Sequence, residues 1–84
     1  MKTELLIEIF EKVGDGFIKE INISHYDLKQ INKICPPEDF PDDFEYCDGH
    51  FVTEEQFTML KEYIVELSIY NYQDYDYNII TRSI

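Results

Sequence analysis

The N-terminal part of the sequence alternates apolar and polar residues with a period of two, and this pattern limits the fold more than any other feature. Leu5, Ile7 and Ile9 share one face of a first predicted strand. The apolar residues of 17–23 repeat the period in a second strand. Gly14–Gly16 lies between them and supplies the positive φ angles of a tight turn, so the pattern predicts a β-hairpin.

Three further apolar residues of this hairpin, Leu6, Phe10 and Ile18, have the opposite parity. A sheet with one fully solvated face would carry polar residues at these positions. We therefore expect the second face of the sheet to be partly covered, and a binding partner is one candidate for the cover.

A short helix is predicted from Tyr26 to Ile34, where apolar residues follow at helical spacing. Ser24 can accept a hydrogen bond from the free amide three residues on, and Asp27 favours the positive end of the helix. Pro36 and Pro37 end the helix, because the residue before a proline avoids the helical region.

A second helix is predicted from Glu54 to Leu67 and has the clearest start signal in the chain. Thr53 and Gln56 have the spacing of a capping box. Val52 and Phe57 can form the hydrophobic staple around it.

The C-terminal residues predict a last strand. Tyr75, Tyr77 and Ile79 alternate with polar residues, and Thr81 continues the period. Asn71–Asp74 is the turn that leads into this strand.

A chain of 84 residues supports one core rather than two. The predicted fold is therefore α+β, with residues 1–84 as a small single domain. Its antiparallel sheet has three to four strands, formed by the N-terminal hairpin plus the C-terminal strand, and two helices pack on one face.

The segment between the two predicted helices, residues 36–49, is called the acidic loop. No lysine or arginine occurs between Lys33 and Lys61. Long loops in compact domains are usually functional or disordered. The aromatic residues Phe40, Phe44 and Tyr46 predict that this loop is anchored to the domain. Its carboxylates are Glu38, Asp39, Asp42, Asp43, Glu45 and Asp48.

The net charge of −11 indicates a basic protein as partner. It argues against nucleic acids and anionic membranes, whose binding requires lysine and arginine. Glu4 and Glu8 interrupt the first apolar run, which therefore does not resemble a signal peptide. The expected compartment is the cytoplasm, where Cys35 and Cys47 would be thiols.

The motifs of metal sites and active sites are missing from the sequence. Its soft metal ligands are His25, Cys35, Cys47 and His50. Their spacing lacks the CxxC and HxxxH pairs of zinc sites, and the acidic loop lacks the alternating order of a calcium loop. There is no phosphate-binding glycine loop, serine elbow or activated cysteine. The sequence predicts a protein that is not an enzyme and needs no metal or cofactor.

Five of the seven tyrosines fall near the C terminus among aspartates, and residues 72–77 are called the tyrosine strip. We expect about half of these tyrosines in the core and the others as interface anchors. A solvated, solubilising surface is the alternative interpretation of the acids, but their self-repulsion without nearby cations disfavours it. The residues predicted to bind a partner are Glu38, Asp39, Asp42, Asp43, Glu45, Asp48, Tyr72, Asp74, Tyr75 and Asp76.

Two segments carry a family resemblance: GFIKEINISHYDLKQINKI at 16–34 and DDFEYCDGHFVTEEQFTML at 42–60. Together they resemble small acidic immunity proteins of bacterial contact-dependent growth inhibition and other polymorphic toxin systems. The similar portion spans about Glu8 to Leu60.

The resemblance implies a cytoplasmic protein that binds one cognate toxin domain, often a basic nuclease. Its carboxylates would replace the phosphates of the toxin's substrate, and its aromatic residues would fix the register. The alternative is a nucleic-acid-mimic inhibitor or regulatory adaptor that binds a basic host protein. Both functions use the same charge.

Overall fold

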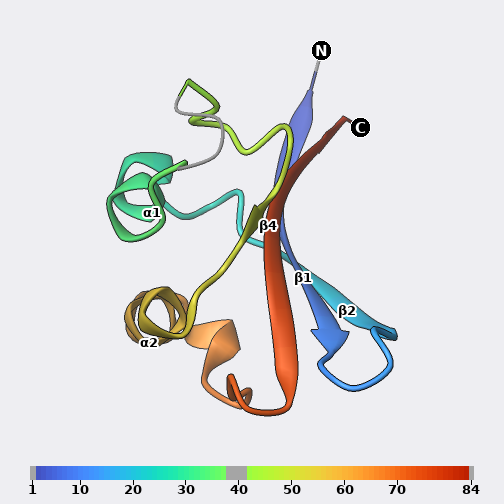
Figure 1. The fold of residues 1–84 in the computed structure, drawn as a ribbon. Coiled ribbons are helices and arrows are strands. Elements are labelled where there is room, and N and C mark those ends of the chain that lie inside the picture. Colours follow the sequence, from blue (N-terminus) through green and yellow to red (C-terminus); the bar gives the residue numbers. More distant parts are fainter. Residues whose placement is uncertain (1, 38–41, 84) are drawn as a thin grey trace.

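The computed structural model describes residues 2–37 and 42–83, which form a four-stranded antiparallel sheet with two α-helices on one face (Figure 1). The elements in chain order are β1 (Thr3–Glu11), β2 (Phe17–Asn22), α1 (Leu28–Ile34), β3 (His50–Phe51), α2 (Glu54–Tyr63), the 3₁₀ turn η1 (Val65–Leu67) and β4 (Tyr75–Ser83). The strands lie in the order β2-β1-β4-β3. The predicted fold is confirmed.

The predicted hairpin joins β1 to β2. Gly14 and Asp15 have φ angles of 90° and 55°, which the turn requires. The Glu11 amide closes the turn by donating to the Gly16 carbonyl at 2.7 Å. The pairing register shifts by a bulge just after Ile9.

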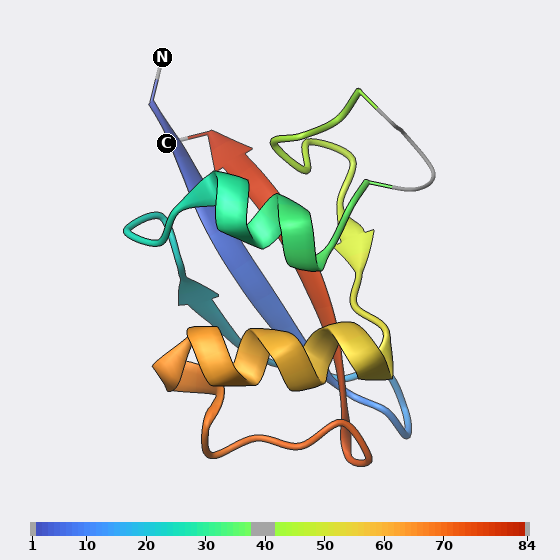
Figure 2. The ribbon, with the colours of Figure 1, turned by 90° about the vertical axis from the view of Figure 1, so that its left-hand side faces the viewer.

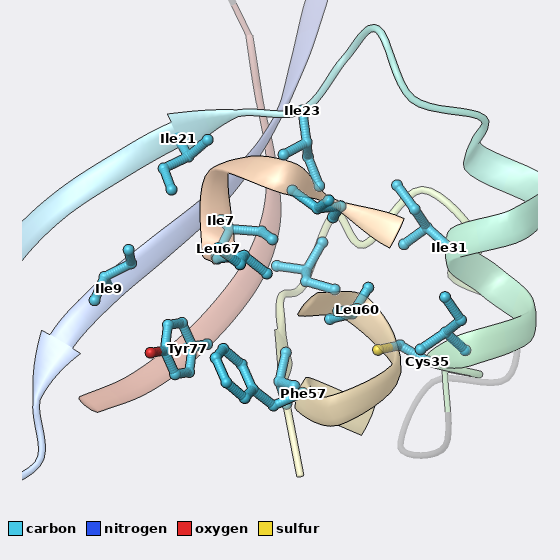
Figure 3. Packing of buried hydrophobic residues seen from close by; sticks show 14 of the residues in the cluster. Ile7, Ile9, Ile21, Ile23, Ile31, Cys35, Phe57, Leu60, Leu67 and Tyr77 are labelled. Atoms are coloured by element: carbon cyan, nitrogen blue, oxygen red, sulfur yellow. The ribbon is translucent and has the colours of Figure 1, made fainter. Parts of the chain in front are cut away.

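Apolar side chains from both helices and from one face of the sheet form a single buried cluster (Figure 3). Ile7 of β1, Ile31 of α1 and Leu60 of α2 all belong to this cluster (Figure 3). The ring of Phe57 stacks on Tyr77 of β4 with centroids 4.4 Å apart. This core fixes α2 and the sheet relative to each other.

Helix α1 begins later than predicted. Asp27, rather than Ser24, is its N-cap residue, and its carboxylate accepts from the Lys29 amide at 3.0 Å. The Ser24 hydroxyl instead accepts from the Leu5 amide of β1 at 2.9 Å. The predicted cap was wrong because Ser24 has a partner on a strand distant in sequence.

Helix α2 begins as predicted but ends four residues early. The capping box of Thr53 and Gln56 is present. The helix ends at Tyr63 because its C-cap residue, Ile64, has extended φ and ψ angles of −101° and 103°, and residues 65–67 form η1. The Val65 amide donates to the Tyr26 hydroxyl at 3.2 Å instead of continuing the helix. None of the helices in the described part of the chain is long and apolar enough to cross a membrane.

The face of the sheet away from the helices carries a bridge of charged side chains. Arg82 of β4 lies 2.9 Å from Glu20 of β2 and 3.4 Å from Glu4 of β1. The register places these partners on either side of Leu6, which is only 2% exposed. The expected cover of this face is therefore supplied at Leu6 by the sheet's own side chains, whereas Ile18 is 42% exposed.

Candidate functional site

Residues 42–49 of the acidic loop lie near the end of β4, whereas the tyrosine strip leads into its start (Figure 1). Thr81, near the end of β4, donates from its hydroxyl to the Glu45 carbonyl and from its amide to the Tyr46 carbonyl at 3.2 Å. Tyr75 is the first residue of the same strand. A strand rises about 3.4 Å per residue, so these contacts are about 20 Å apart. The loop residues that contact Thr81 therefore lie apart from Tyr75 along the same strand.

Tyr46 anchors the described part of the acidic loop, as predicted. Its side chain is fully buried, and its hydroxyl donates to the Cys35 carbonyl at 2.7 Å. Burial raises the pKa of this phenol, so the hydroxyl stays a donor at neutral pH. Phe44 was expected to be a second anchor, but it is 53% exposed. Three other predicted residues lie outside the described part of the chain: Glu38, Asp39 and Phe40.

Asp43 shapes the acidic loop from within. Its two carboxylate oxygens accept from the backbone amides of Cys47 and Asp48 at 2.8 and 2.9 Å. Charge-assisted hydrogen bonds to backbone amides are stronger than neutral ones. Asp43 therefore holds the turn around Tyr46 and is the least available of the described loop acids for a partner.

Lys12 occupies the tyrosine strip. Its ammonium lies 2.9 Å from Asp76 Oδ1 and 4.0 Å from the centroid of the Tyr72 ring. The hydrogen bond with Asp76 raises the pKa of Lys12, so the charge persists at neutral pH. The strip is therefore neutralised in part by a cation that lies more than sixty residues away in the sequence.

The other members of the strip have contacts within the domain as well. Asn71 and Asp74 exchange two hydrogen bonds of 2.9 and 2.7 Å across the turn before β4. The Tyr75 ring lies edge-on against Tyr70, with centroids 5.7 Å apart. The geometry explains these residues as parts of the fold and makes the strip the weaker candidate for binding.

A different set of exposed side chains lies along one edge of the molecule. The chain runs from the acidic loop through β3 to the start of α2 along one edge of the molecule (Figure 2). The exposed acidic and phenylalanine side chains of this segment are called the acidic edge and are Asp42, Phe44, Glu45, Asp48, Phe51, Glu54 and Glu55. None of these carboxylates forms a salt bridge with any residue that the structure describes.

Two large aromatic side chains project from the acidic edge. Phe44 is 53% and Phe51 is 72% exposed. Aromatic residues are enriched in protein interfaces, and carboxylates around them would attract a basic partner. The acidic edge is therefore the candidate functional site.

The sequence predictions identified three of these seven residues: Asp42, Glu45 and Asp48. They missed Phe51, Glu54 and Glu55 as binding residues, and they assigned Phe44 to an internal role. The absence of cations between Lys33 and Lys61 was the signal that could have extended the site past the loop into α2. The exposure of the two phenylalanines depends on tertiary packing and had no sequence signal.

The possible metal ligands do not converge. No group of three or more His, Cys, Asp or Glu side chains within 2–37 and 42–83 is arranged to hold a metal ion. His50 contacts Gln56 at 2.9 Å, and His25 lies 3.6 Å from Glu66. Cys35 is buried and Cys47 is exposed, and both are free thiols.

The two thiols are expected to react at different rates. Desolvation raises the pKa of both thiols, that of Cys35 to about 12, but only the Cys35 sulfur is shielded from the reagent by burial. Iodoacetamide at pH 8 should therefore modify Cys47 in the folded protein and Cys35 only after unfolding, which mass spectrometry of the intact and digested protein would show. Equal modification of both thiols under native conditions would contradict the described packing of Cys35.

The fold and the acidic edge define a small acidic α+β domain with one margin of unpaired carboxylates and exposed phenylalanines. The chain belongs to a family described as a domain of unknown function, DUF7683, whose model matches residues 4–79. The match contains the whole acidic edge. No curated protein and no solved structure matches the chain.

Proposed function

We propose that this protein is an immunity protein that binds and neutralises a cognate toxin domain with a basic surface, most simply a nuclease. It acts in the cytoplasm by covering the toxin's active site or substrate-binding surface. The proposal assigns the protein a binding role and no catalytic step.

The acidic edge is the observation that supports this proposal most. The five carboxylates of the acidic edge repel each other, and this repulsion destabilises a small domain unless nearby cations offset it. None of the five forms a salt bridge with a described residue, although Glu54 interacts electrostatically with Lys12. No lysine or arginine lies between Lys33 and Lys61 in the sequence, and Lys61 donates to the Tyr70 carbonyl at 2.7 Å. A cationic partner surface would relieve the repulsion.

The acidic edge suits inhibition by charge and by contact area. Carboxylates at the positions of substrate phosphates attract the lysines and arginines of a nuclease site and accelerate encounter. Phe44 and Phe51 then lose exposed apolar area in the complex, which slows dissociation. Rapid association and slow dissociation are what protection from a toxin demands.

The proposal predicts that a toxin domain is encoded beside the gene, and it is tested by co-expressing the protein with that domain in a sensitive bacterial strain. We expect the protein to restore growth and to form a stable complex with the toxin in size-exclusion chromatography. The Phe44→Ala/Phe51→Ala variant should fold but protect less. Loss of growth together with no complex between the purified proteins would overturn the proposed function.

A further inference from the structure

A pocket opens on the face of the sheet away from the helices. It has a volume of about 340 Å³ and is lined by Phe10, Asp15, Phe51 and Asp76. The strand register explains how residues so distant in sequence meet. Phe10 of β1 pairs with Asp76 of β4, and Phe51 of β3 pairs with the residue two positions after Asp76. Side chains two residues apart on a strand share a face.

The two ends of the pocket are fixed by different elements. Phe51 belongs to the shortest strand at the sheet edge and is 72% exposed. Phe10 is packed edge-on against Phe17 with centroids 5.7 Å apart. Asp15 comes from the hairpin turn, where its φ of 55° is held by the tight connection. The pocket therefore has one ring that packs against another aromatic side chain, Phe10, and one that is largely exposed, Phe51.

The charge of the pocket is negative. Asp76 forms a salt bridge with Lys12, whose ammonium lies 2.9 Å from Asp76 Oδ1. Asp15 forms no salt bridge with any described residue. Glu8 lies on the same face, and its carboxylate accepts from Asn78 at 3.0 Å. One uncompensated carboxylate in the lining and another nearby favour a cation over a phosphate or a neutral ligand.

We propose that this pocket binds a guanidinium group, the arginine side chain of a basic partner. A guanidinium is planar and weakly hydrated, so it stacks on the Phe10 and Phe51 rings while its N–H groups reach Asp15. A lysine ammonium is more strongly hydrated and cannot stack as a plane. A nucleic-acid base could stack as well, but its phosphate would meet the carboxylates.

The assignment of the arginine to a protein partner rests on the proposed function. Phe51 belongs both to the acidic edge and to the pocket, so a toxin seated on the edge would place side chains at the pocket's rim. The pocket would then fix the orientation of the toxin on the acidic edge, which long-range charge attraction alone does not determine.

The test uses a capped arginine, Nα-acetyl-L-arginine amide, titrated into the isotope-labelled protein and followed by NMR. We expect saturable shifts of the Phe10 and Phe51 ring signals and of the Asp15 amide. The uncharged isostere, Nα-acetyl-L-citrulline amide, should bind at least about tenfold more weakly, which is an increase of about one unit in log Kd. Weak shifts spread over all exposed carboxylates, or equal shifts with citrulline, would overturn the proposal.

Two variants separate the pocket from general charge. Phe51→Ala and Asp15→Asn should each weaken arginine binding severalfold, and both positions are exposed, so the variants should fold. Phe44→Ala removes an exposed ring outside the pocket and should leave the titration unchanged. Unchanged binding by Phe51→Ala would refute the stacking geometry.

The same experiment distinguishes this inference from the proposed function. Failure of arginine to saturate the pocket, with protection from the toxin intact, would discard the pocket and leave the immunity function. Saturable arginine binding by a protein that protects from no toxin would support the pocket and discard the immunity function.

Discussion

Tyr46→Ala is expected to lower the free energy of unfolding by about 3–5 kcal/mol, the range for removing a large aromatic side chain from a core. The Tyr46 ring is fully buried, and its hydroxyl is the partner of the Cys35 carbonyl. Alanine would leave a cavity and an unpaired acceptor at the end of α1. Urea denaturation followed by circular dichroism measures the change.

Two control variants separate the causes of this loss. Tyr46→Phe keeps the ring and should cost about 1–2 kcal/mol through the lost hydrogen bond. Phe44 is two positions from Tyr46 in the sequence, and its side chain is exposed. Phe44→Ala should therefore change the free energy of unfolding by less than about 0.5 kcal/mol. A larger loss for Phe44→Ala than for Tyr46→Ala would show that the acidic loop is anchored by the other aromatic ring.

Reversing two charges of the acidic edge, Glu45→Lys/Asp48→Lys, is expected to slow association with the toxin domain by at least about tenfold at low salt. Both side chains are exposed and unpaired, so their field reaches the approaching partner. The association rate should also depend less on salt, because fewer attractive charges remain to be screened. Stopped-flow fluorescence at several ionic strengths measures both effects.

A matched variant tests whether position or net charge matters. Glu11→Lys/Glu62→Lys changes the net charge by the same amount at exposed sites outside the acidic edge. We expect at most a severalfold decrease in association rate for this variant. Equal slowing by the two double variants would mean that overall charge, rather than the acidic edge, steers the encounter.

Local patterns were sufficient to predict the architecture. The hairpin follows from the Gly14–Gly16 turn, and the start of α2 follows from Thr53 and Gln56, because all of these residues act on backbone groups within a few positions. The α+β class follows because the apolar faces of these helices and strands must be buried against each other in one core. The start of α1 was mispredicted because Ser24 bonds to β1, a contact that no local pattern contains.

The candidate site was predicted only in part, because exposure and pairing are tertiary properties. Asp43 and Asp48 look alike in sequence, but only Asp43 turns inward to accept two backbone amides. Phe44 and Tyr46 look like equivalent anchors, but only the tyrosine reaches a buried acceptor. Asp76 appeared free until the fold placed Lys12 beside it.

Hydrogen exchange of the protein in the presence and absence of the toxin domain would locate the binding surface. If the acidic edge is the binding surface, the amides of residues 43–55 should gain the strongest protection in the complex, and those of β2 should change little. Protection concentrated in β2 or in residues 71–75, with 43–55 unchanged, would contradict binding through the acidic edge.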